Sequence, residues 1–130
     1  MSDFAMKKRL STSYEQTLGR VPDVLKAEGF GVLTEIDVQS TLKQKLGVEF
    51  RRYKILGACN PPFANEALQA DLQAGLIMPC NVVVYEDDDH GTVVLVIDPT
   101  KTAAATGNPK LAAMAEALKQ KLASALAKLD

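Results

Sequence analysis

Alternating and β-branched stretches along the chain predict five strands. They cover residues 4–10, 30–36, 50–59, 81–86 and 92–97. The last two are separated by the segment 87–91, whose Asp and Gly residues tolerate the positive backbone angles of a tight turn. We therefore expect these two stretches to form an antiparallel hairpin. The uninterrupted apolar run 93–97 is typical of a central strand that is buried on both faces.

Apolar residues at spacings of three and four predict a first helix between the first two strands. Ser13 is expected to cap its start, with Gln16 completing a capping box, and Gly29 is expected to end it. Pro22 lies inside the apolar pattern and lacks a backbone N–H donor. We therefore expect either a kinked helix or two short ones.

Caps and apolar spacing predict three more helices, at residues 37–47, 60–75 and 108–129. Each opens with an Asp or Asn, whose side chain can accept hydrogen bonds from the first helical N–H groups. Gly75 is expected to close the middle helix, and the last helix carries one continuous apolar stripe. The small and polar residues 100–107 are expected to form a flexible loop.

The expected order of elements, β-α-β-α-β-α-β-β-α, predicts an α+β fold. The hairpin excludes a purely parallel sheet, so the simplest packing is a mainly antiparallel five-stranded sheet covered by helices. The long C-terminal helix is the natural cover for one sheet face. A chain of 130 residues has the length of a single domain, which we place at residues 1–130.

Composition narrows the range of partners and compartments. Hydrophobic residues make up 47% and charged residues 24%, which is ordinary globular usage. Fifteen basic and sixteen acidic residues leave a net charge of −1, so no nucleic-acid partner is expected. No apolar run approaches the ~20 residues that cross a bilayer, and the N-terminal basic cluster lacks the apolar core of a secretory signal. We expect a cytoplasmic protein without a membrane partner.

The two cysteines mark the candidate site. Cys59-Asn60 leaves one predicted strand, and Cys80-Asn81 enters the next after Pro79. If these strands are antiparallel neighbours, both Cys-Asn pairs lie at the same end of the sheet. Cys59, Asn60, Pro79, Cys80 and Asn81 are therefore candidate ligand-binding residues. The alternatives are that the cysteines are buried small apolar residues, that Asn60 is a helix cap and that Asn81 marks the irregular start of a strand.

Other chemistry receives little support from the sequence. Two cysteines and the lone His90 cannot complete a structural zinc site, and Gly-rich phosphate loops and G-x-S-x-G elbows are absent. The acidic run 86–89 is typical of a solvated turn. The basic pair Arg51-Arg52 is either a solvated edge, a dimer contact or an anion site. No catalytic residue is assigned, and a non-enzymatic role is favoured.

Three blocks of the sequence resemble the domain-of-unknown-function 302 family. In the family's order they are residues 30–37 with 43–46, residues 53–61, and residues 78–86. The similarity runs from about Tyr14 to Pro99 and into the last helix, although the family usually continues a regular helix at Pro22. The resemblance implies a β-α-β(4)-α core of the TATA-binding-protein-like topology class, often homodimeric. In that core, strands two to five form a meander and strand one pairs with strand five. It implies no activity.

Three functions remain open from the sequence. The favoured one is a small-ligand or metal-binding module with a pocket at the sheet end near the two Cys-Asn pairs. A non-enzymatic homodimeric interaction protein is the first alternative. A thiol redox protein that uses Cys59 and Cys80 is the second. The sequence names neither the ligand, which is a small molecule or a metal ion, nor any cofactor.

Overall fold

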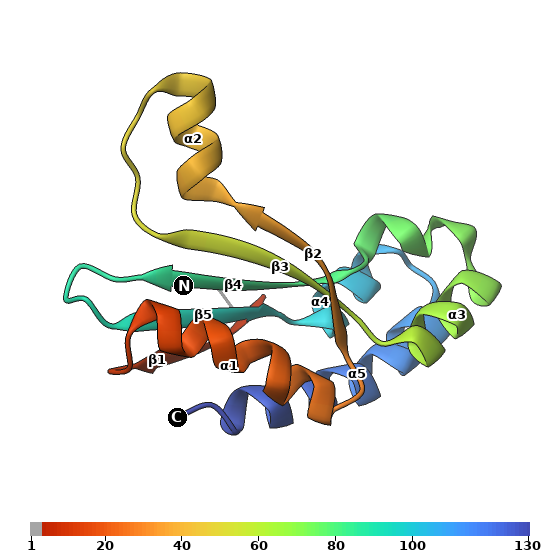
Figure 1. Cartoon of the computed structure of the whole chain (residues 1–130). Helices are drawn as coiled ribbons and strands as arrows, with labels where there is room; N and C mark the ends of the chain where they lie inside the picture. Colours follow the sequence, from red (N-terminus) through yellow and green to blue (C-terminus); the bar gives the residue numbers. More distant parts are fainter. Residues whose placement is uncertain (1–3) are drawn as a thin grey trace.

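The computed structural model describes residues 4–130 and confirms the α+β fold (Figure 1). In chain order the elements are β1 (Ala5–Leu10), α1 (Tyr14–Ala27), β2 (Gly31–Asp37), α2 (Val38–Leu46), β3 (Tyr53–Cys59), α3 (Pro61–Ala70), the 3-10 helix η1 (Leu72–Ile77), β4 (Cys80–Glu86), β5 (Thr92–Ile97), α4 (Pro99–Ala105) and α5 (Pro109–Ala127).

The five strands form one antiparallel sheet in the order β1-β5-β4-β3-β2. Strands β2 to β5 therefore make a meander and β1 pairs with β5, as the family resemblance implied. Helices α1 and α5 lie against one face of this sheet (Figure 1). Val94 and Val96 point to that face and are buried, whereas Leu95 points to the other face and is only half-buried. Val93 shares the face of Leu95 and is buried, so the expectation that β5 is buried on both faces is confirmed at Val93 and wrong at Leu95.

The main core fills the space between the sheet and helices α1 and α5. Every second residue of the inner strands contributes to it, as the two-residue period of a strand requires. Its most deeply buried aliphatic members are Val21, Leu56, Val82, Val84, Val94 and Leu122. Each such side chain contributes about 1.5–3 kcal/mol relative to an exposed one. This layer fixes the sheet against α1 and α5.

A second, smaller cluster joins the helices at the far end of the sheet. Its buried members come from α3, η1, α4 and α5 and are mostly alanines: Ala67, Ala74, Ala103, Leu111 and Ala115. Alanine brings helices close together but fills little volume between them. This end of the molecule is where the candidate site lies.

Side-chain caps start the helices at the expected residues. Ser13 accepts a hydrogen bond from Gln16 N–H at 3.2 Å, and Asp37 accepts one from Ser40 N–H at 2.9 Å. Helix α1 then runs without interruption through Pro22, so the expectation of two short helices is wrong. A proline inside a helix removes one hydrogen-bond donor, and the rest of the helix continues through packing of its apolar face.

Three boundaries differ from the sequence expectations. The helix that starts after Asn60 ends at Ala70, and a new 3-10 helix follows it through Gly75. Asp71 separates the two because its side chain accepts from Gln73 N–H at 2.9 Å. Residues 99–105 are helical as α4 rather than a flexible loop. Strand β3 begins at Tyr53, three residues later than expected.

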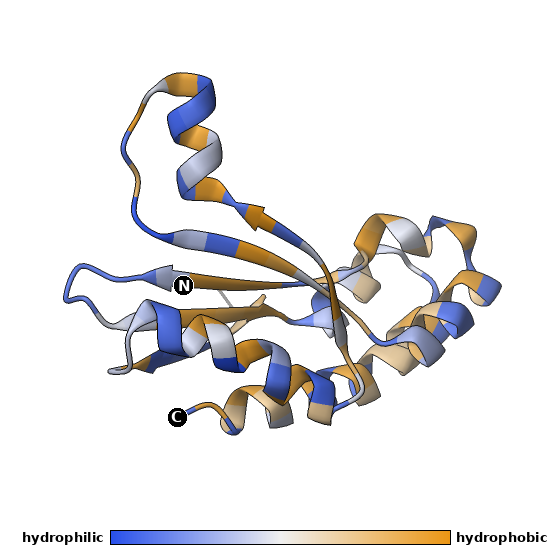
Figure 2. Ribbon diagram, in the orientation of Figure 1, coloured by the Kyte–Doolittle hydropathy of each residue, from blue (hydrophilic) through white to orange (hydrophobic). Residues whose placement is uncertain are grey.

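Helix α2 stands away from the body of the fold at the end of β2 (Figure 1). None of its residues is buried, and the ribbon colours show both hydrophobic and hydrophilic residues along it and the segment that follows (Figure 2). Large exposed apolar residues gather on β2, α2 and this segment: Leu33, Ile36, Leu46, Val48 and Phe50. None of the helices within residues 4–130 is long and apolar enough to cross a membrane.

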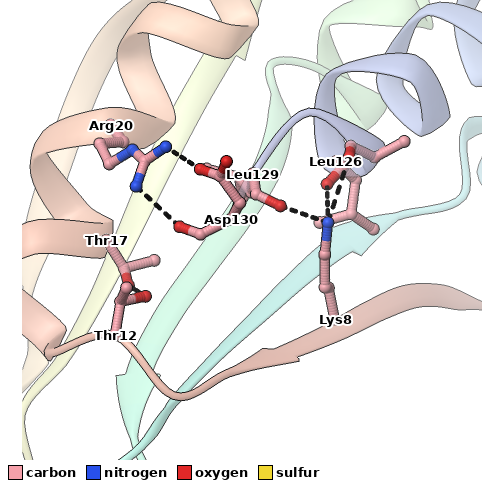
Figure 3. A network of polar contacts seen from close by, with 8 residues as sticks. Lys8, Thr12, Thr17, Arg20, Leu126, Leu129 and Asp130 are labelled. Carbon is pink, nitrogen blue, oxygen red and sulfur yellow. Dashed lines mark hydrogen bonds and ion pairs between the residues drawn. The ribbon is translucent and has the colours of Figure 1, made fainter.

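The two ends of the chain are tied together by polar contacts (Figure 3). Lys8 Nζ of β1 donates hydrogen bonds to the carbonyl oxygens of Leu126 (3.3 Å), Ala127 (3.2 Å) and Leu129. Arg20 of α1 binds both the carbonyl oxygen and the carboxylate of Asp130. These contacts anchor the C-terminal end of α5 to the sheet and to α1.

Candidate functional site

The two Cys-Asn pairs lie at the same end of the sheet. In the β3–β4 register, Ala58 is opposite Cys80 and Gly57 is opposite Asn81. Neighbouring residues of a strand point to opposite faces, so Cys80 shares the inner face with Ala58. Cys59 starts from the other face, although both cysteines border the space beyond the sheet end.

An apolar cavity occupies this space, between the sheet end and the helices α3, η1, α4 and α5. Its volume is about 70 Å³, and the whole recess with its open mouth encloses about 580 Å³. Phe30, Ala58 and Cys80 form the sheet side of the wall, with Met78 and Pro79 at the entry to β4. The helices contribute mostly alanines, leucines and methionines, including Ala67, Ala103, Leu111, Met114, Ala115 and Leu118. The small side chains of the second cluster are what leave this space unfilled.

Polar groups are few in the cavity wall. No Asp, Glu, Lys, Arg or His is among the described residues that line it. Thr102 lines the wall, but its hydroxyl already donates to the carbonyl oxygen of Pro99 at 3.2 Å. The remaining polar groups are the two thiols and the side-chain amide of Asn60. The cavity therefore presents an uncharged, largely apolar surface.

Asn60 combines a structural and a candidate binding role. Its side chain is 8% exposed and caps α3, because Phe63 N–H donates to Asn60 Oδ1 at 3.4 Å. Pro61 and Pro62 follow at the first helical positions, where a missing donor costs little. Within residues 4–130, Asn60 Nδ2 donates no hydrogen bond. Asn60 is therefore a helix cap, which is one of the alternatives that the sequence left open. Its amide nitrogen has no hydrogen-bond partner among the described residues.

The five predicted site residues do not all reach the cavity. Cys59, Asn60, Pro79 and Cys80 line it. Asn81 is exposed on β4 and is not part of the wall. Pro79 follows a cis peptide bond and packs against Gly57, where an added Cβ would stand 2.8 Å from Pro79 Cγ. A ligand-binding role for the four lining residues remains a prediction.

Both cysteines are free thiols. Burial raises the pKa of the Cys80 thiol to about 11, and the neighbouring Cys59 adds to the rise. Redox cysteines need the opposite shift, because the thiolate is the reacting species. Among residues 4–130, no group of three His, Cys, Asp or Glu side chains is placed to hold a metal ion.

The charged clusters singled out in the sequence form ion pairs away from the cavity. Arg51 pairs with Asp88 at 2.9 Å and lies over the ring of Tyr85. Arg52 pairs with Glu15. In the acidic turn, Asp87 accepts from the N–H groups of Asp89 and Gly91, each at 2.9 Å. These contacts account for the turn without a ligand.

Sequence reasoning missed the helical half of the wall. The sequence predicts a loop at residues 100–107, and a flexible loop gives no reason to place Thr102 and Ala103 in the wall of a site. A signal was present, because Asp98-Pro99 repeats the cap-proline pattern of Asn60-Pro61 and Asn108-Pro109. Asp98 does cap α4 by accepting from Thr100 N–H at 2.9 Å.

Comparisons with known proteins agree with the fold. A crystal structure of an uncharacterized conserved DUF302 protein from Bacillus stearothermophilus matches with a TM-score of 0.91 and 32% sequence identity. The match covers 99% of this chain and 100% of that one. No curated protein matches the chain. The family model "Domain of unknown function DUF302" matches residues 6–129, which confirms the resemblance. Because that model spans nearly the whole sequence, the chain belongs to the DUF302 family.

Proposed function

We propose that this domain binds a small, largely apolar molecule in the cavity at the sheet end. The observation that carries the proposal is the uncharged wall that the sheet and four helical elements build around one space. Ligand pockets are mainly apolar and hold a few placed polar groups, here the amide of Asn60. Members of both core clusters line the cavity, so the ligand contacts side chains of the main core and of the second cluster.

The volume of the cavity limits the size of the ligand group that can enter it. An engineered cavity of about 150 Å³ in another protein accepts benzene. A cavity of about 70 Å³ therefore takes a short aliphatic group, and the rest of the molecule lies in the mouth. The cavity is less suited to a metal ion than to an apolar molecule. A thiol must lose its proton to bind a metal, and burial raises the pKa of Cys80.

The test is a titration of the 15N-labelled protein with 4-methyl-2-pentanone, a small branched ketone, followed by NMR. We expect saturable shifts at the backbone amides of residues 58–60, 77–78, 80, 102–103 and 111–118. Ala115→Leu adds bulk to the cavity wall and should abolish them. Ala123→Leu places the same side chain on the exposed side of α5 and should keep them.

Two results would count against this function. One is the absence of saturable shifts in the native protein. The other is unchanged ketone affinity in Ala115→Leu. If Ala115→Leu loses its native spectrum through overpacking, Ala103→Val fills the same cavity with less added volume.

A homodimer is the second candidate function, and a different observation favours it. The sheet face opposite α1 and α5 carries a cross-strand apolar row of Ile36, Ile55, Val83 and Leu95. Ile36 is 50% exposed and the other three are half-buried. Leu33 beside it is 67% exposed. We infer that a second copy covers this face, because burying such apolar side chains is favourable.

Sedimentation at micromolar concentration tests the dimer. The native chain should sediment as a dimer and Leu33→Lys as a monomer. Leu72→Lys is the matched control, since Leu72 is 86% exposed but lies on η1, away from the sheet face. A native chain that sediments as a monomer rules out this function.

A further inference from the structure

We propose that the amide nitrogen of Asn60 recognises the ligand, so that the ligand carries an uncharged hydrogen-bond acceptor such as a ketone, ester or amide carbonyl. The inference rests on the proposed function and names the chemical class of its ligand. It starts from one side chain that is more than nine-tenths buried and has one polar end without a protein partner.

The cap decides which end of the amide is free. A helix cap must accept a hydrogen bond, so the oxygen of Asn60 faces the first turn of α3 and receives Phe63 N–H. The NH2 group consequently turns away from α3. It carries two donor hydrogens, and within residues 4–130 neither is used. The nitrogen keeps some contact with solvent, because no fully buried side-chain nitrogen or oxygen of the described residues lacks a partner. A ligand carbonyl can therefore take the place of water as its acceptor.

The surroundings give the amide nitrogen its own space. Gly29 ends α1 with φ 88°, and a Cβ at Gly29 would stand only 3.1 Å from Asn60 Nδ2. The glycine thus leaves room for the amide at the junction of α1, β2 and α3. Phe30, the next residue, belongs to the cavity wall together with Asn60. Asn60 therefore lies at the border of the cavity, where its amide is within reach of a ligand in the recess.

The wall also specifies that the acceptor is neutral. Its described residues include no Lys, Arg or His that could balance a carboxylate or phosphate. Moving an unpaired anion out of water is far more costly than moving a carbonyl group, which needs one hydrogen bond. A carbonyl therefore satisfies Asn60 without introducing a new unpaired charge.

Three probes of nearly the same shape test the inference. They are 4-methyl-2-pentanone, the hydrocarbon 2-methylpentane, in which CH2 replaces the carbonyl, and 3-methylbutanoate, in which a carboxylate replaces the ketone. Asn60→Asp is the variant, because it keeps the oxygen that caps α3 and removes the donor. We expect the ketone-to-hydrocarbon affinity ratio to fall about tenfold in Asn60→Asp. The carboxylate should bind the native protein at least tenfold more weakly than the ketone.

A second readout uses the native protein alone, in case Asn60→Asp does not fold. The side-chain 15N–1H2 resonances of Asn60 should shift when the ketone is added and remain unchanged when the hydrocarbon is added. Asn65 on the exposed side of α3 is the internal control, and its side-chain resonances should remain unchanged with both probes. Failure of both neutral probes to bind contradicts the proposed function itself. Binding of both with an unchanged ratio and an unshifted Asn60 overturns only the role of the amide, and equal binding of the carboxylate overturns the neutral acceptor.

Discussion

Gly29 is the single residue on which both a helix end and the candidate site depend. Phe30 N–H donates to the carbonyl oxygen of Leu25 at 2.9 Å, and Gly29 N–H donates to that of Lys26 at 3.0 Å. This pair of bonds needs a left-handed residue at position 29, which glycine adopts without a steric penalty. The same missing side chain leaves room for the amide of Asn60.

Gly29→Ala should therefore destabilise the protein by about 1–2 kcal/mol, because an L-residue is strained at φ 88°. Urea unfolding measures the change. Gly19→Ala is the matched control: Gly19 lies on the exposed side of α1 with open space around its Cβ position. That substitution should stabilise the protein by about 0.5–1 kcal/mol. Equal effects at the two glycines would contradict the assignment.

The two cysteines should differ sharply in reactivity. With a pKa of about 11, roughly one Cys80 thiol in a thousand is ionised at pH 8, three units lower. Cys59 is less buried. In native protein treated with iodoacetamide, intact mass should show labelling of Cys80→Ser and hardly any of Cys59→Ser. In urea both variants should be labelled equally. Fast native labelling of Cys80 would bring back the redox alternative.

At the scale of whole elements, the end of α5 depends on a side chain from the first strand. A helix leaves its last carbonyl groups without intrahelical partners, and a cation near them also complements the helix dipole. Lys8 supplies three donor bonds there (Figure 3). The contact joins segments more than a hundred residues apart in sequence and helps to hold the long helix across the sheet.

Lys8→Met should cost about 1–2 kcal/mol of stability, because it keeps most of the apolar stem and removes the donors. The free energy of unfolding in urea measures the loss. Lys7→Met changes the neighbouring exposed lysine of β1, which points to the other face, and should stay within about 0.5 kcal/mol of the native value. A loss of the same size at both positions would show that the carbonyl contacts do not matter.

Helix α4 carries one wall of the cavity and depends on a buried carboxylate. Burial acts to raise the pKa of Asp98, but hydrogen bonds from Thr100 and Lys119 outweigh it and hold the pKa below its ordinary value. A lowered pKa in the folded state means that the stabilisation is complete above the unfolded value, about 3.9, and is lost as the pH falls through the folded value.

Asp98→Asn should accordingly destabilise the protein by about 1–3 kcal/mol at pH 7, with a gap to the native protein that narrows at pH 3. The asparagine still offers an oxygen to Thr100, so the loss reports the ion pair with Lys119. Asp88→Asn is the control, since that carboxylate is exposed and its pair with Arg51 should contribute less than about 1 kcal/mol. A gap that stays constant with pH would contradict the assignment.

The element scale also explains what the sequence could and could not predict. Caps and apolar periods identified all five strands and most helices, because Ser13, Asp37 and Asn60 act through their nearest neighbours. The break between α3 and η1 was missed, since Leu72 keeps the helical spacing although it is exposed. The cavity depends on how α4 and α5 pack, and local patterns do not carry that information.

The whole molecule is asymmetric in how firmly its parts are held. Strands β4 and β5 lie inside the sheet, over the main core. Helix α2 projects from the body of the fold at the end of β2 and contacts chiefly β3 (Figure 1). Regions with little buried apolar surface open at low free energy, and a central strand opens only with global unfolding. The apolar residues exposed on β2, α2 and the segment that follows α2 make this the region where the proposed second copy would bind.

Hydrogen exchange read by mass spectrometry should resolve this gradient. At low micromolar concentration, amides of α2 should exchange far faster than those of β5. Amides of α1 should also exchange much more slowly than those of α2, because Val21 and Leu25 anchor α1 in the core. Uniform exchange would contradict the gradient. Raising the protein concentration separates two cases: if a second copy covers the sheet face, protection rises in β2 and α2 and stays constant in α3. If the chain remains a monomer, α2 exchanges equally fast at every concentration, and the role of the protein rests on the cavity.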